Sequence, residues 1–151
     1  MGESLPLDRT PEWLAALQAR GYRTTAPLRL VVQALATSQR VLSPLQVYEL
    51  VHAQNPRISL VTVYRTVEKL EELGLIQRVH TPSGCQAFIA GNSGHQHILI
   101  CENCGRVEFF GGDMLDPLIS GVSQETGYRI AGHWLQLFGT CTPCQQLLKN
   151  S

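Results

Sequence analysis

Residues 59–74 read SLVTVYRTVEKLEELG, a stretch with the features of one amphipathic helix. Ser59 can cap its first turn, because a serine hydroxyl accepts a hydrogen bond from the backbone N–H groups left free there. Gly74 provides a stop signal, since glycine readily adopts the left-handed conformation that ends many helices. Between these two signals, apolar residues recur at the spacing of one buried helix face: Val63, Val67 and Leu70.

The sequence on either side of this helix predicts a winged helix-turn-helix. Three shorter helical patterns precede it, and the third opens with the capping box Ser43-Pro-Leu-Gln46. Two short strand patterns follow it, residues 75–80 and 85–89, on either side of the turn signal TPSG. In a helix-turn-helix, the recognition helix enters the major groove of DNA by its N-terminal residues.

Three residues of the predicted helix are candidates for DNA contact: Thr62, Tyr64 and Arg65. They lie off the buried stripe and near the N-terminal end. An arginine can pair with a base edge or a phosphate, and a tyrosine ring can lie on a thymine methyl group. The alternative is that Tyr64 is partly buried and that Arg65 pairs with Glu68 or Glu49.

Composition separates the two halves of the chain. Residues 1–80 carry nine Lys+Arg and seven Asp+Glu, whereas residues 81–151 carry three and five and hold all five cysteines. The net charge of zero excludes nucleic-acid binding by bulk charge alone, but not a local basic surface. The sequence contains no run of about 18 apolar residues and no secretory signal. We therefore expect a cytoplasmic protein with no membrane span and no disulfides.

The cysteines of the second half predict a zinc site. The two C-x2-C motifs are Cys101-Glu-Asn-Cys104 and Cys141-Thr-Pro-Cys144, separated by 36 residues. Two such turns can complete a tetrahedron of thiolates around Zn2+, and four protein ligands leave no open position, so we expect one structural ion per chain. The alternatives are four free thiols or a redox pair, although neither motif has the strand–helix context of a thioredoxin.

Histidines predict a second metal site in the same half. His95 and His97 immediately precede a strand pattern, and alternation places both imidazoles on one side. His133 lies in the strand-like run 128–138, and Asp116 begins a helix between them. Three imidazoles and a carboxylate suit Zn, Fe, Mn or Ni. Two other carboxylates compete for the role of Asp116: Glu108 and Asp113.

His80 and Cys85 flank the TPSG turn of the predicted hairpin. A thiolate with an imidazole favours Zn2+ over hard cations, and a hairpin can bring such a pair together. Ligands from the second half would be needed to complete the coordination, so an ion there would fix the hinge between the halves. The alternative is a partly buried thiol and an exposed histidine.

These motifs resemble the ferric uptake regulator family over roughly residues 10–145. The resemblance rests on Thr62-Val-Tyr-Arg65, on HQHILICENCG from His95, and on the run 127–144 with the second cysteine motif. It implies a dimeric, metal-dependent transcriptional regulator with a winged-helix domain and an α/β dimerisation domain. It also implies roles for individual residues: structural zinc at the four cysteines, a metal site at His95, His97, Asp116 and His133, and DNA contact at Tyr64 and Arg65.

The sequence departs from the family at the hinge site through which members usually sense metal. The corresponding positions carry residues that are not ordinary ligands: Gln96, Ile98, Arg40 and Ile89. This departure argues against iron or peroxide sensing by that site and leaves His80 and Cys85 as the candidates to replace it. Zinc-sensing branches of the family use a cysteine in their hinge site, so the resemblance favours a zinc uptake regulator.

The sequence therefore predicts an α+β protein in three parts: a winged-helix DNA-binding domain (1–84), a hinge (85–94) and a small α/β dimerisation and metal-binding domain (95–151). We expect a homodimer that binds double-stranded operator DNA and represses zinc-uptake genes, with Zn2+ at the structural site and at one or more regulatory sites. We expect no enzymatic activity and no small-molecule substrate, because the chain lacks H-E-x-x-H and the deaminase H-x-E signature. The alternatives are an iron or peroxide sensor of the same family, or a zinc-ribbon interaction module that does not bind DNA.

Overall fold

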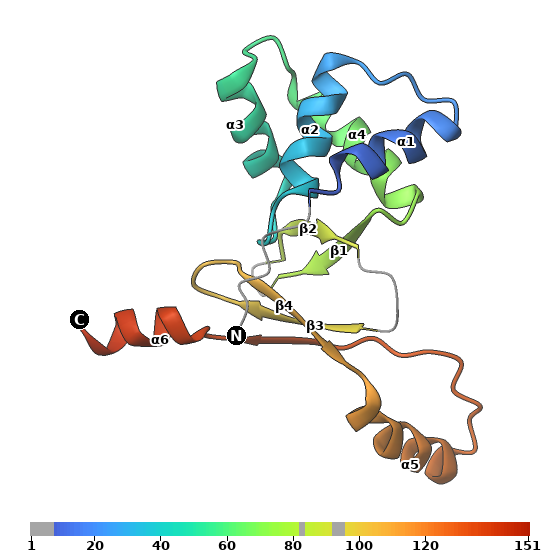
Figure 1. The fold of residues 1–151 in the computed structure, drawn as a ribbon. Helices are drawn as coiled ribbons and strands as arrows, with labels where there is room; N and C mark the ends of the chain where they lie inside the picture. The colour runs from blue at the N-terminus through green and yellow to red at the C-terminus, as the bar shows by residue number, and fades with distance from the viewer. Residues whose placement is uncertain (1–7, 82–83, 92–95) are drawn as a thin grey trace. The chain divides into compact units, whose positions relative to one another are not determined.

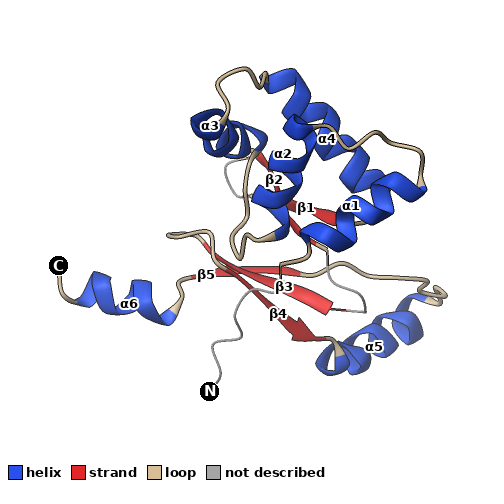
Figure 2. Cartoon of the chain, turned by 45° about the horizontal axis from the view of Figure 1, so that its top comes forward, coloured by secondary structure: helices blue, strands red, loops and turns tan. Residues whose placement is uncertain are grey.

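The computed structural model describes residues 8–81, 84–91 and 96–151. The chain divides into two compact units, Met1–Gly91 (unit 1) and Asn92–Ser151 (unit 2). Unit 1 combines helices with a two-stranded sheet, and unit 2 is built on a three-stranded sheet (Figures 1 and 2). This combination confirms the predicted α+β fold class.

Three of the described helices of unit 1 begin at capping signals of the sequence, whereas the first helix has no side-chain cap. Ser59 accepts a hydrogen bond from the backbone N–H of Thr62 at 3.2 Å, and Gly74 follows the helix with a positive φ of 69°. The capping box is also formed, with Ser43 and Gln46 bonded in both directions. The helices in the described part of unit 1 are α1 (Thr10–Ala19), α2 (Ala26–Ala36), α3 (Pro44–Gln54) and α4 (Leu60–Glu72).

The predicted hairpin is formed by β1 (Ile76–His80) and β2 (Gln86–Ala90), which pair antiparallel. It is attached to the helical part of unit 1 through Phe88. The backbone of Phe88 exchanges two hydrogen bonds with that of Leu42, at 2.8 and 2.9 Å, just before α3. The predicted hinge, 85–94, overlaps β2, whereas residues 92–95 lie outside the described residues.

The core of unit 1 is one continuous apolar cluster to which all four helices and the hairpin contribute. Trp13 and Leu17 of α1 are fully buried in it. The predicted stripe of α4 faces the same cluster: Val63, Val67 and Leu70 are all buried. Burial of this one face explains why α4 leaves its opposite face, with Tyr64 and Arg65, in solvent.

Unit 2 contains a sheet with the strand order β4-β3-β5. The central strand pairs antiparallel with β4 and parallel with β5. The strands are β3 (Gln96–Cys101), β4 (Val107–Gly111) and β5 (Gln136–Gly139). The helical elements are η1 (Asp113–Leu115), α5 (Asp116–Thr126) and α6 (Thr142–Lys149).

Little of unit 2 is buried outside β3 and the start of β4. Ile98, Ile100 and Val107 are buried apolar residues of these strands. Helix α5 contributes no buried side chain, and Leu118 on it is 63% exposed. In the described part of the chain, none of the helices has the length and hydropathy needed to cross a membrane.

Candidate metal centres and DNA-binding helix

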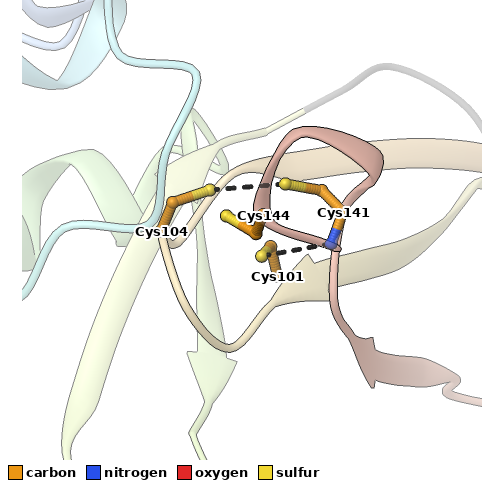
Figure 3. A group of neighbouring side chains, drawn as sticks. All are labelled: Cys101, Cys104, Cys141 and Cys144. Atoms are coloured by element: carbon orange, nitrogen blue, oxygen red, sulfur yellow. Dashed lines mark hydrogen bonds between the residues drawn. The ribbon is translucent and has the colours of Figure 1, made fainter. Parts of the chain in front are cut away.

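The two C-x2-C motifs come together because β3 and β5 are neighbours. Cys101 ends β3 and is opposite Gly139 at the end of β5, so Cys104 and Cys141 lie in the turns that leave these two strands. Cys144 follows in the first turns of α6. The four sulfurs point toward one common point (Figure 3) and all lie within 4.8 Å of one another, without a disulfide.

The size of this cluster fits a tetrahedral zinc ion. With Zn–S bonds of about 2.3 Å, sulfur atoms at the corners of a tetrahedron are about 3.8 Å apart. The Sγ atoms of Cys104 and Cys141 are 3.8 Å apart. Cys101 and Cys144 are buried, so water has little access to two of the four sulfurs. The predicted grouping of the four cysteines is therefore present.

Backbone geometry also prepares the cluster for a cation. The backbone N–H of Cys141 donates a hydrogen bond to Cys101 Sγ at 3.3 Å. That bond stabilises the thiolate and lowers the pKa of Cys101 to about 6. Hydrogen bonding to Cys141 and burial raise the pKa of Cys144 to about 12. The two shifts favour a thiolate at Cys101 and a protonated thiol at Cys144, and the Cys144 thiol must lose its proton to bind a cation.

Two of the predicted histidine ligands meet at the other end of the same sheet. His97 of β3 is 3% exposed, and its Nε2 lies 3.3 Å from Nε2 of His133. Two nitrogens bound to one tetrahedral Zn2+ at about 2.0–2.1 Å are also about 3.3 Å apart. The pair thus has the spacing of two ligands of one ion. Phe110 packs against it, with its ring centroid 5.5 Å from that of His97.

The remaining predicted ligands do not complete this pair in the structure. His95 lies outside the described residues, and Asp116 is exposed at the start of α5. Among the described residues, the four cysteines are the one group of three or more potential ligands, so Asp116, Glu108 and Asp113 do not join the histidines. The four-residue site stays a prediction. One sequence detail was wrong: His133 precedes β5, which begins only at Gln136.

His80 and Cys85 lie at the turn end of the hairpin, and both are exposed. His80 ends β1 opposite Gln86 in the register, so Cys85 is one residue beyond the last pair. Both line a hollow of about 170 Å3 with Arg78 and Thr81. Residues 82 and 83 of the turn lie outside the described residues. The two side chains therefore share one surface, and their ligation of an ion stays a prediction.

The predicted DNA-contacting residues of α4 differ in their availability. Tyr64 and Arg65 are exposed, and Arg65 forms neither of the ion pairs considered for it within the described chain. The hydroxyl of Thr62 is 3.0 Å from that of Ser59, so this side chain takes part in the helix cap. Of the three predicted residues, Tyr64 and Arg65 are the exposed ones, and their contact with DNA stays a prediction.

Three of the positions that the resemblance assigns to the hinge site have described side chains, and their assignment stays a prediction. Ile89 and Ile98 are buried apolar residues, and Arg40 is exposed and cationic. Sequence reasoning missed Phe110 beside His97, since its position depends on the β3–β4 register, in which His97 faces Phe110. No local signal in the sequence sets that register.

Comparison with known proteins shows one family by sequence and the same fold among solved structures. The sequence model of the ferric uptake regulator family matches residues 19–138. The ferric uptake regulation protein of Cupriavidus metallidurans is 33% identical over 129 residues, which cover 85% of this chain and 90% of that protein. A solved zinc-bound manganese uptake regulator has a TM-score of 0.70 and 27% identity over 85% of this chain and 98% of its own. A zinc uptake regulator complexed with zinc and DNA also has a TM-score of 0.70, over 97% of this chain and 99% of its own, but at 16% identity the likeness concerns the fold alone.

Proposed function

Because the chain belongs to the ferric uptake regulator family of metal-responsive transcription regulators, we propose that it is a zinc-dependent repressor that binds operator DNA as a homodimer. The observation that carries this proposal is the pairing of two features in one chain. Unit 2 has a four-thiol cluster of the size of a zinc tetrahedron, and unit 1 exposes Tyr64 and Arg65 at the start of α4. The first feature suits a resident metal, and the second suits contact with a major groove.

Two classes of metal site are proposed. Cys101, Cys104, Cys141 and Cys144 would hold one structural zinc, because their geometry leaves no open position. A regulatory ion would bind at His97 and His133, completed by His95 and Asp116. His80 and Cys85 would provide a further hinge site, and their thiol is the reason to propose zinc as the sensed ion. When bound, the ions at the cysteines and at His97 and His133 would cross-link segments that lie far apart in the sequence.

The exposed apolar surface of unit 2 supports the homodimer. Tyr128, Trp134 and Leu137 are 75%, 62% and 44% exposed, although each carries a large apolar surface. In the described sheet, β5 is an edge strand that pairs with β3 alone, so its other edge is open to a strand of a second copy. A second copy would cover both the edge and the apolar side chains.

Regulation would follow from restricting the orientation of two DNA-binding units in one dimer. Two recognition helices must meet half-sites about 34 Å apart on one face of the duplex. Metal need favour the competent arrangement by only ~1–3 kcal/mol to change DNA affinity ~5–150-fold. Binding of one metal ion to one additional set of ligands can contribute a free energy of this size.

The proposal is tested by selecting a preferred DNA sequence in vitro and measuring its affinity at buffered concentrations of free Zn2+, Fe2+ and Mn2+. We expect affinity to rise with zinc and to rise less with the other ions. A curve that stays flat for all three ions would remove the sensor function.

A second candidate is an iron or peroxide sensor, and the name of the Cupriavidus metallidurans relative, a ferric uptake regulation protein, favours it. In that case the same titration would respond most strongly to Fe2+. A mass increase of histidine-containing peptides after exposure to Fe2+ and peroxide would favour the peroxide sensor.

The third candidate is an interaction module that does not bind DNA. It predicts that the metal-loaded parent chain selects no DNA sequence, whereas the other two candidates bind DNA through Tyr64 and Arg65, which replacement of both residues by Ala tests. We expect the double substitution to abolish operator binding while the dimer stays intact. Unchanged binding by this variant would show that α4 does not read DNA.

A further inference from the structure

An ion pair joins the recognition helix α4 to the hairpin of unit 1. Glu71 lies in the last turn of α4, and Arg78 lies in β1. The guanidinium donates two hydrogen bonds to the carboxylate, from Nε to Oε1 at 2.9 Å and from Nη2 to Oε2 at 2.8 Å. A bidentate pair of this kind fixes direction as well as distance, because two parallel bonds constrain both planar groups.

Arg78 also contacts the second strand of the hairpin. Its guanidinium carbon lies 5.6 Å from the ring centroid of Phe88, which is opposite Arg78 in the β1–β2 register. Phe88 is buried in the core, and its backbone is bonded on both sides to Leu42, next to the N-cap of α3. Arg78 thus links the end of α4 to the hairpin and, through Phe88, to the start of α3.

This junction is poorly placed to contribute much to folding stability. The side chains of Arg78 and Glu71 are 40% and 32% exposed, and ion pairs with such access to water add little to the free energy of unfolding. What a bidentate pair can supply here is a defined angle. Helix α4 is held at its C-terminal end by two bonds to a strand that is itself tied to the core.

We propose that Arg78, acting through Glu71, is a positioning residue that sets the angle of α4 for DNA recognition. The inference rests on the proposed function, since it requires that α4 reads DNA. Contacts to phosphates fix the register of a protein on the duplex, and contacts to base edges supply specificity. Once the register is fixed, the angle of α4 determines whether Tyr64 and Arg65 reach their base edges.

The test compares operator affinity with affinity for unrelated DNA, in the full-length, metal-loaded protein. Glu71→Ala removes an acidic charge, so an effect of charge alone would strengthen binding to any DNA. We expect instead that Glu71→Ala weakens operator binding about 10-fold, roughly the value of one misplaced base contact, and that binding to unrelated DNA is equal or tighter. Glu72→Ala is the matched control, because it removes the neighbouring exposed carboxylate of α4. It should weaken neither operator binding nor binding to unrelated DNA.

Arg78→Lys separates positioning from a direct phosphate contact. Lysine keeps the positive charge but lacks the planar fork, so it can replace a phosphate ligand but not a bidentate pair. We expect Arg78→Lys to lose about as much operator affinity as Glu71→Ala, about 10-fold. The variant with both substitutions should be no weaker than either one, because both remove the same junction.

Two results would overturn the inference. One is operator binding that tightens in Glu71→Ala as it does in Glu72→Ala, and the other is full operator affinity in Arg78→Lys. If Glu71→Ala fails to fold, the Arg78→Lys result decides alone. These outcomes are distinct from failure of the proposed function, in which Tyr64→Ala with Arg65→Ala would leave operator binding unchanged.

Discussion

Unit 1 and unit 2 differ in how they are held together. Unit 1 buries a continuous apolar cluster with contributions from every helix and from the hairpin. Unit 2 buries a few residues of β3 and β4, whereas its longest helix, α5, buries none and its surface carries many exposed apolar side chains. We therefore expect unit 1 to be held mainly by hydrophobic burial, and unit 2 to depend on the proposed metal at the cysteines and on the proposed second copy of the chain.

This difference in burial suits different roles for the two units, DNA recognition in unit 1 and metal response in unit 2. A unit with its own core presents α4 in a constant shape, whatever the metal concentration. A unit with a small core responds strongly to an ion, because the free energy of binding one is comparable to its whole stability. We expect metal status to be registered mainly at the histidines of unit 2, with His80 and Cys85 of unit 1 as the proposed further site, and DNA to be read by α4 of unit 1.

The largest expected effect is that of removing the structural metal. Binding of structural zinc contributes ~10–16 kcal/mol in small domains, as much as the total stability of a typical one. Cys144→Ser, or chelation of the ion, should therefore abolish the protection of backbone amides of β3 and β5 from hydrogen exchange. The backbone amides of α2 and α4 serve as the internal control and should keep their protection from hydrogen exchange. Unchanged protection in unit 2 would show that it does not depend on the metal.

A core substitution in unit 1 should destabilise unit 1 and leave metal binding by unit 2 unchanged. Trp13 is fully buried, and Trp13→Ala should cost about 3–5 kcal/mol of the free energy of unfolding of unit 1. Zinc content per chain should stay the same. The matched control is Trp134→Ala, which removes an indole that is 62% exposed in unit 2, and it should leave the unfolding of unit 1 unchanged. Loss of zinc in Trp13→Ala would contradict the independence of the two units.

The proposed dimer interface is tested by introducing a charged residue on α5. Leu118 is 63% exposed, and burying a leucine against a partner is worth about 1.5–3 kcal/mol. Leu118→Asp should raise the dimer dissociation constant at least about 10-fold, which sedimentation equilibrium can measure. Gln124→Asp adds the same charge to a polar position of α5 and should change the dimer dissociation constant little. If both variants dimerise like the parent chain, α5 is not part of the interface.

The smallest expected effect concerns the cap of α4. Ser59 accepts a hydrogen bond from Thr62 N–H, and its loss in Ser59→Ala should cost about 1 kcal/mol of the stability of unit 1. Chemical denaturation followed by helix circular dichroism detects a change of this size. Ser120→Ala, on an exposed face of α5, is the comparison. An equal cost for both serines would mean that the cap has no special role.

The parts of the fold that could be predicted are those set by local chemistry. Ser59 and Gly74 marked the ends of α4, and the spacing of Val63, Val67 and Leu70 marked its buried face. The C-x2-C spacing was enough to group the cysteines, because thiols on two tight turns are a strong indication of one tetrahedral ion.

The parts that could not be predicted depend on distant contacts. The strand pattern around His133 extended too far, since the sequence does not reveal that pairing with β3 begins only at Gln136. The bidentate pair of Glu71 and Arg78 crosses a turn whose geometry the sequence leaves open. Asp116 begins α5 as expected, but this helix buries no side chain in the chain as described, so its packing could not be predicted from a buried face.

The most direct test of the account measures the affinity of the regulatory site for zinc in the presence and absence of operator DNA, with the four-cysteine site filled throughout. Coupling between two binding sites is reciprocal, so DNA must tighten metal binding by the same factor by which metal tightens DNA binding. Competition with a fluorescent chelator should give a zinc affinity ~5–150-fold higher with operator DNA than without it. Equal affinities would contradict the claim that metal bound to unit 2 governs the reading of DNA by unit 1.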